Sequence, residues 1–102
     1  MRLSLQEKEA ILIAINKIDP TAKVFLFGSR TNDTQKGGDI DLLIISDTIN
    51  FSTKLDILTE IKIKIGDQKI DLILKKNTDL ENDPFVNSIL PQAIQLNHDL
   101  FI

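Results

Sequence analysis

Residues 24–45 read VFLFGSRTNDTQKGGDIDLLII, and this stretch decides the fold. Two short runs of large apolar residues bracket a polar loop that contains glycine, which is typical of two buried strands and their connection. The second run nevertheless begins with two carboxylates, Asp39 and Asp41. Residues two apart on a strand point to the same side, so both charges share one face. Two like charges on one face of a buried strand call for a chemical reason.

The sequence around this stretch predicts helices and strands in turn. Periodic apolar residues, Ser4 with Glu7 as a capping box, and Pro84 behind an Asp N-cap indicate helices. We expect helices over residues 4–20, 51–66 and 83–96, and strands over residues 23–28, 39–45 and 69–74. The order α-β-β-α-β-α predicts an α/β fold, a short sheet flanked by helices in a single pair of layers.

Two further expectations concern the secondary structure of residues 59–65 and the placement of two phenylalanines. Ile61, Ile63 and Ile65 alternate as in a strand, so residues 59–65 fit either a helix or a strand. Their length and a following glycine, which suits a helix C-cap, favour the helix. Phe25 and Phe27 fall within a short apolar run, and we expect both in the core.

The composition limits the classes of protein that fit. With 102 residues, of which 42% are hydrophobic, we expect one folded domain spanning residues 1–102. The absence of cysteine excludes disulfides and thiolate-bound zinc. A net charge of -3 argues against a general nucleic-acid binder. Neither a signal peptide nor an apolar run that could span a bilayer is evident, so we expect a cytoplasmic protein.

A bound cation explains the paired aspartates most simply. Asp39 and Asp41 repel each other, and burial increases the cost of keeping both ionised. Oxygen ligands without nearby His or Cys suit Mg²⁺ or Mn²⁺. Asp71 begins the DLIL of the next strand, as Asp41 begins DLLI. If the two strands are neighbours, Asp71 completes a cluster of three metal-binding carboxylates.

The loop before the aspartates suits a phosphate group. Gly28 allows a sharp turn or a close approach of the backbone to a ligand. Ser29 offers a hydroxyl and an N–H group, and Arg30 offers a positive fork that matches phosphate. Each of these features alone is typical of an ordinary strand-ending turn. Together, a phosphate binder beside a carboxylate-held metal is what phosphoryl or nucleotidyl transfer requires.

The combination GSR, GGDIDLLI and KIDLIL resembles the minimal nucleotidyltransferases of the DNA polymerase β superfamily. The resemblance covers residues 24–74 and implies a small polymerase-β-like fold with ATP as substrate. It implies two Mg²⁺ (or Mn²⁺) ions held by Asp39, Asp41 and Asp71, with Asp71 also drawing the proton from the acceptor hydroxyl. It further implies that Gly28, Ser29 and Arg30 bind the β- and γ-phosphates.

Small proteins of this family often act as antitoxins of HEPN-domain ribonuclease toxins, and are thought to adenylylate a tyrosine of that partner. The resemblance thus implies a protein adenylyltransferase in a toxin–antitoxin pair, which can form a hetero-oligomer with the toxin. Two alternatives stay open. One is an antitoxin that neutralises its partner by binding alone. The other is a nucleotidyltransferase for a small molecule such as an aminoglycoside.

Overall fold

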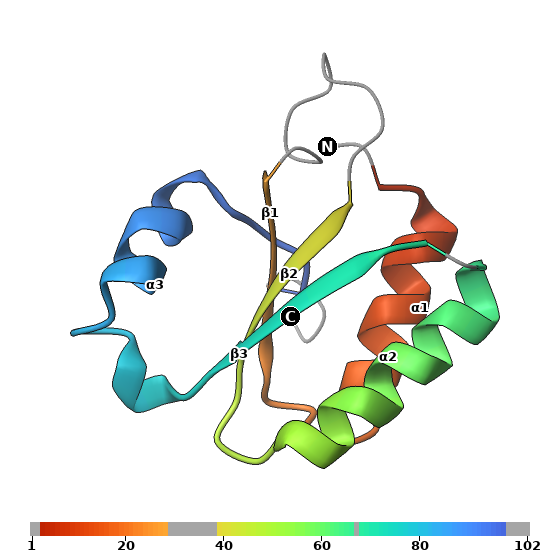
Figure 1. Cartoon of the computed structure of the whole chain (residues 1–102), viewed down its shortest axis with the longest axis horizontal. Coiled ribbons are helices and arrows are strands. Elements are labelled where there is room, and N and C mark those ends of the chain that lie inside the picture. Colours follow the sequence, from red (N-terminus) through yellow and green to blue (C-terminus); the bar gives the residue numbers. More distant parts are fainter. Residues whose placement is uncertain (1–2, 29–38, 67, 98–102) are drawn as a thin grey trace.

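In the computed structural model, residues 3–28, 39–66 and 68–97 are described, and they form a small α/β domain (Figure 1). Three helices and four strands are connected in part by short 3-10 turns. The elements in chain order are α1 (Leu5–Asn16), β1 (Lys23–Phe27), β2 (Ile40–Ile45), α2 (Phe51–Ile65), β3 (Ile70–Lys75), η2 (Asn77–Asp79), α3 (Pro84–Ile89), η3 (Leu90–Gln92) and β4 (Ile94–Gln95). The predicted order of the first six main elements is confirmed. No helix within these ranges is both long and apolar enough to cross a membrane.

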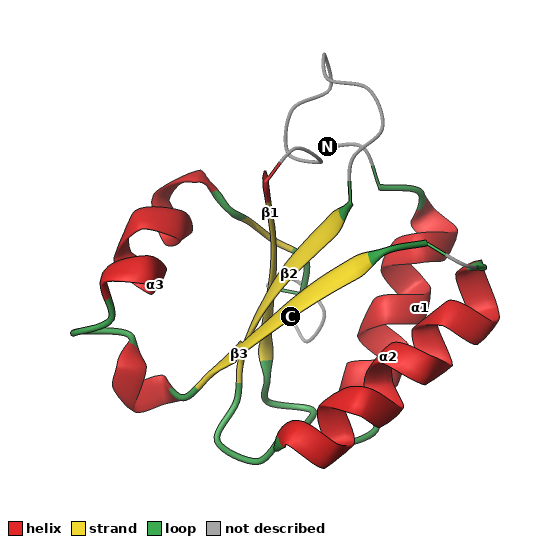
Figure 2. Ribbon diagram, in the orientation of Figure 1, coloured by secondary structure: helices red, strands yellow, loops and turns green. Residues whose placement is uncertain are grey.

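The four strands form one mixed sheet in the order β3-β2-β1-β4 (Figure 2). β1 pairs antiparallel with both β2 and β4, whereas β2 and β3 run parallel. A parallel pair needs a long crossover connection, and α2 supplies it. This arrangement makes β2 and β3 direct neighbours, as the metal hypothesis required.

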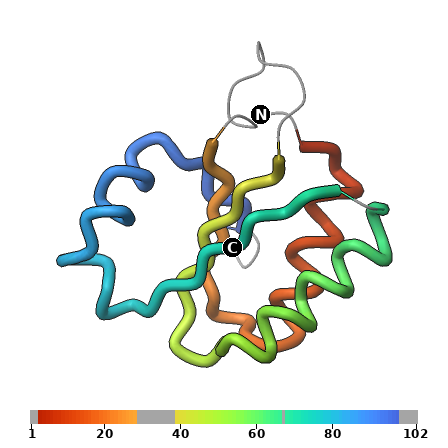
Figure 3. Tube along the Cα trace, in the orientation of Figure 1, coloured from red at the N-terminus to blue at the C-terminus, as the bar shows by residue number. Residues whose placement is uncertain are grey.

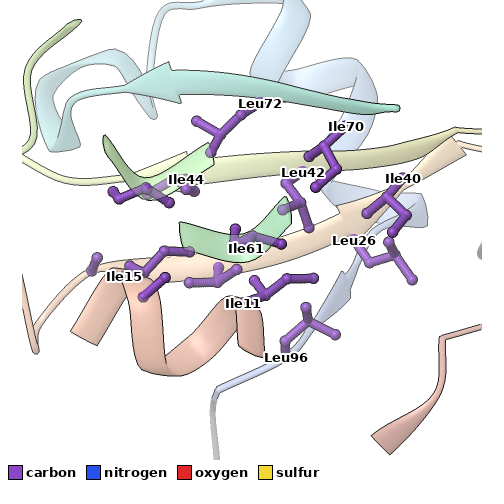
Figure 4. Packing of buried hydrophobic residues seen from close by; sticks show 14 of the residues in the cluster. Ile11, Ile15, Leu26, Ile40, Leu42, Ile44, Ile61, Ile70, Leu72 and Leu96 are labelled. Carbon is purple, nitrogen blue, oxygen red and sulfur yellow. The ribbon is translucent and has the colours of Figure 1, made fainter. Parts of the chain in front are cut away.

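The core lies between the sheet and the helices α1 and α2. Ser4 and Glu7 cap α1 reciprocally, with hydrogen bonds of 3.0 and 2.9 Å. Alternate residues of β1, β2 and β3 point toward these two helices and pack with their apolar faces (Figure 4). The cluster includes Ile11, Ile15, Leu26, Ile40, Leu42, Ile44, Ile57, Ile61, Ile70 and Leu72. Ile61 is fully buried in a helix that continues to Ile65, so the helical reading of residues 59–65 is confirmed.

The opposite face of the sheet is covered in part by α3 (Figure 3). Phe27 points away from α1 and α2, and its ring meets Phe85 of α3 edge-on, with centroids 6.0 Å apart. Val86 of α3 is completely buried. The expectation of a single pair of layers is therefore wrong, because α3 packs on the face of the sheet that points away from α1 and α2.

The C-terminal part departs from the predicted helix over residues 83–96. Asp83 caps α3 as expected, accepting hydrogen bonds from Phe85 and Val86. The α-helix ends at Ile89, and the turn η3 contains Pro91, which lacks the N–H that a helix interior needs. Residues Ile94–Gln95 then join the sheet as β4. Pairing with β1, a contact distant in sequence, overrides the local helical pattern.

Candidate active site

The sheet register brings Asp41 and Asp71 together. In the parallel pair of β2 and β3, Asp41 lies directly opposite Asp71. Across the antiparallel pair, Asp41 also faces Phe27 at the end of β1. All three side chains point to the face away from α1 and α2, since directly opposed residues share a face. Two predicted site residues 30 positions apart in sequence are thus neighbours in the fold.

The closeness of the two carboxylates changes the acidity of Asp41. Burial raises its pKa above the usual value, and the negative charges of Asp71 and Asp39 raise it further. A side-chain hydrogen bond with Asp71 acts in the same direction, because it is made by the protonated carboxyl, and Lys69 only partly opposes these effects. The carboxyl group of Asp41 therefore keeps its proton to a higher pH than an isolated aspartate would.

Asp39 lies one residue before β2 and forms an ion pair that the sequence analysis did not predict. Its Oδ2 lies 3.6 Å from the Nζ of Lys69, and both side chains are largely exposed. The backbone N–H of Ile40 donates to the carbonyl of Lys69, which fixes this alignment. Once Asp41 is placed opposite Asp71, the parallel register puts Lys69 opposite Asp39. The signal for this ion pair was therefore present in the sequence, in the common spacing of Asp39 and Lys69 from the two paired aspartates.

Gly28 lies close to the carboxyl group of Asp41. It follows β1 with φ at +78°, a conformation that favours glycine. A Cβ at this position would overlap the Oδ2 of Asp41. The backbone at Gly28 therefore approaches another group closely, and that group is Asp41 of the same chain. Ser29 and Arg30, the other two predicted phosphate-binding residues, lie outside the described residues.

A pocket of about 470 Å³ opens beside the two carboxylates. Its walls come from the ends of β1 and β2, from β3 and from the first turns of α2. The lining residues are Phe27, Asp41, Lys54, Leu58, Ile70, Asp71, Leu72 and Ile73. Phe27 is only half-buried and lines this pocket, so its expected place in the core is wrong. It offers an apolar wall next to the acidic pair.

A comparison with family models matches residues 9–97 to the family described as Polymerase beta, Nucleotidyltransferase. The chain belongs to this nucleotidyltransferase family. The matched range contains Gly28 and all three carboxylates, so the resemblance at superfamily level is confirmed. The comparison with curated proteins found no match.

Nucleotidyltransferases of this family generally use Mg²⁺ and ATP. The carboxylate oxygens on the open face have the hard donor chemistry that Mg²⁺ prefers. Within residues 3–28, 39–66 and 68–97, however, no three acidic, His or Cys side chains are grouped closely enough to hold a metal ion. Asp41 and Asp71 are in place, whereas Asp39 is paired with Lys69. A metal site with three carboxylates therefore requires Asp39 to leave Lys69.

Proposed function

We propose that the chain is a minimal nucleotidyltransferase that transfers AMP from ATP to a hydroxyl group of a protein partner. The partner we propose is a HEPN-domain toxin modified on a tyrosine, which makes this chain the antitoxin of the pair. The observation that carries the catalytic part is the register of β2 and β3, which places Asp41 beside Asp71 at a pocket next to Gly28. The protein acceptor and the toxin rest on the resemblance of the GSR and GGDIDLLI motifs.

Each residue at the pocket has a distinct task in this reaction. Asp39, Asp41 and Asp71 would hold divalent cations, which stabilise charge on the attacking and leaving oxygens when bound. Asp71 accepts the proton of the acceptor hydroxyl, whose oxygen bonds to the α-phosphorus as the bond to pyrophosphate breaks. Asp71 is exposed on the outermost strand, so an acceptor carried by another protein can approach it.

The raised pKa of Asp41 fits a site that becomes complete when a metal–nucleotide substrate binds. A raised pKa means that the unliganded pair is under electrostatic strain. Positive charge brought by a metal–nucleotide complex would relieve that strain and favour the ionised form. Gly28, packed against Asp41, places the beginning of the proposed phosphate loop next to the same carboxyl group.

A docking protein without catalysis is the second candidate. The ion pair between Lys69 and Asp39 favours it, because the part of the chain that the structure describes then has no ready group of three metal ligands. The two candidates differ in whether neutralisation of the partner needs the carboxylates.

The experiment combines Asp39→Asn with Asp41→Asn, and uses Asp56→Asn as control. Asp56 is an exposed carboxylate on α2, so the control removes charge away from the pocket. The proteins are incubated with ATP, Mg²⁺ and a co-expressed HEPN-domain partner, and intact masses are recorded. We expect an added AMP on the partner with wild type and control, and none with the double variant. An unmodified partner that all three proteins neutralise equally would refute the transfer and leave docking alone.

A further inference from the structure

The outer edge of β3, beside the pocket, presents a backbone surface that can pair with another strand. β3 is the last strand of the sheet order, and among the described residues only β2 pairs with it. Its unpaired backbone N–H and C=O groups can accept another strand. Four consecutive residues of β3 line the pocket, but only Asp71 and Ile73 lie on the carboxylate face. Ile70 and Leu72 lie on the face of α2, together with Lys54 and Leu58.

An apolar stripe on α2 continues this surface. Phe51 and Leu55 are 70% and 48% exposed, and Leu58 follows at helical spacing and lines the pocket. Glu60, on the opposite side of the helix, reaches Lys17 of α1. The stripe therefore faces away from α1, on the side of the free edge of β3. Figure 1 shows α2 beside β3 at this border of the domain.

We propose that this border is a dimer interface, in which β3 pairs antiparallel with β3 of a second copy around a two-fold axis at Ile73. In this register Asp71 faces Lys75 of the second copy, and Leu72 faces Leu74. Opposite charges on one face and apolar side chains on the other stabilise such a pair. A two-fold axis repeats each contact, so a self-complementary strand is what an isologous interface needs.

The charges also select this register. Centring the pair on Leu72 would place Lys69 opposite Lys75 of the second copy, a like-charge contact that destabilises neighbouring strands. In the favoured register the sheets of the two copies join into one continuous sheet. The α2 helices of both copies then lie on the same face of that sheet. The stripe of Phe51, Leu55 and Leu58 then faces the same stripe of the second copy. Without that cover, these apolar side chains stay in water beside an open strand edge.

The surroundings of Lys75 are compatible with this contact. Its Nζ lies 2.7 Å from Asp83 and 5.9 Å from the ring centre of Phe85. Asp71 of the second copy would add a second carboxylate to the same ammonium group. Strand pairing uses the backbone edge of β3, but it also brings Lys75 of the second copy to Asp71, so the dimer and an acceptor exclude each other at this carboxylate. The mass of the chain tests the dimer whether or not the chain transfers AMP.

The test measures the mass of the full chain by sedimentation equilibrium over a range of concentrations. Leu55→Lys places a charge in the stripe, next to Lys54. Ile63→Lys is the matched control, since Ile63 is 78% exposed on the same helix and lies outside the stripe. We expect a wild-type dimer, a dissociation constant at least about tenfold higher for Leu55→Lys, equivalent to about 1.4 kcal/mol, and no change for Ile63→Lys.

A cysteine at the axis tests the register. The chain contains no cysteine, so Ile73→Cys introduces a single thiol that meets its own copy at disulfide distance only if the axis passes there. We expect a disulfide-linked dimer from Ile73→Cys under mild oxidation and mostly monomer from Ile63→Cys. A wild-type chain that stays monomeric at every concentration would overturn the proposal. So would a dimer that is unaffected by Leu55→Lys, or one that Ile73→Cys does not cross-link.

Discussion

Replacing Gly28 with alanine tests whether the backbone and Asp41 are packed against each other as the structure shows. Gly28 has φ at +78°, and an L-residue in the left-handed region costs about 1–2 kcal/mol. The new methyl group would also overlap the Oδ2 of Asp41, so that side chain or the loop must move. Such overpacking costs about 1–3 kcal/mol. We expect Gly28→Ala to lower the free energy of unfolding by roughly 2–5 kcal/mol in total.

Gly66→Ala is the matched control. Gly66 has φ at +92°, so the same substitution strains the backbone there too. Its added Cβ would meet nothing within 4 Å. We therefore expect only a backbone cost, about 1–3 kcal/mol, because a φ of 92° with a ψ of −175° is a conformation that essentially only glycine adopts. Only Gly28→Ala should disturb Asp41, so the titration of Asp41 isolates the contact.

Urea unfolding at neutral pH measures both variants, and NMR titration of the Asp41 carboxyl reports on the contact directly. A difference of 1 kcal/mol corresponds to a shift in Tm of about 4–8 °C for a domain of this size. We expect Gly28→Ala to shift the Asp41 titration and to weaken the binding of Mg²⁺ with ATP, and Gly66→Ala to do neither. Equal destabilisation of the two variants with an unchanged Asp41 titration would refute the packing argument.

Two further predictions concern acidic groups and their neighbours. Asp71→Asn removes a like charge, so the pKa of Asp41 should fall toward its usual value in an NMR titration. Because a raised pKa in the folded state makes the Asp41 contribution to stability decrease as the pH rises through that pKa, this variant should gain stability relative to wild type in urea unfolding as the pH rises from about 3 to about 7; a constant difference between the two proteins would contradict the coupling. Ser46→Ala removes a hydroxyl that donates to the buried Asp19 over 2.5 Å and accepts two backbone N–H groups, and should cost about 1–3 kcal/mol. The exposed Ser88→Ala serves as control in the same unfolding assay, and equal effects of the two would show that the Ser46 network contributes little.

The sequence by itself determined the elements whose signals are local. Helical spacing and the capping box of Ser4 and Glu7 identified α1, and short apolar runs identified β1, β2 and β3. The combination of GSR, GGDIDLLI and KIDLIL identified the nucleotidyltransferase superfamily, which the family match confirms. These features depend on neighbours within a few residues, so a linear reading can find them. The phosphate-binding roles of Ser29 and Arg30 stay predictions.

The tertiary structure decided what depends on pairing between distant segments. The two-residue strand β4 has no periodicity of its own and exists because β1 offers it an edge. The open face of β2 and β3 needed cover, which placed α3 opposite α1 and α2 and brought Phe85 against Phe27. Lys69 became the partner of Asp39 only through the parallel register of β2 and β3. Strand register is set by the sheet as a whole, and it decides which charges meet at this site.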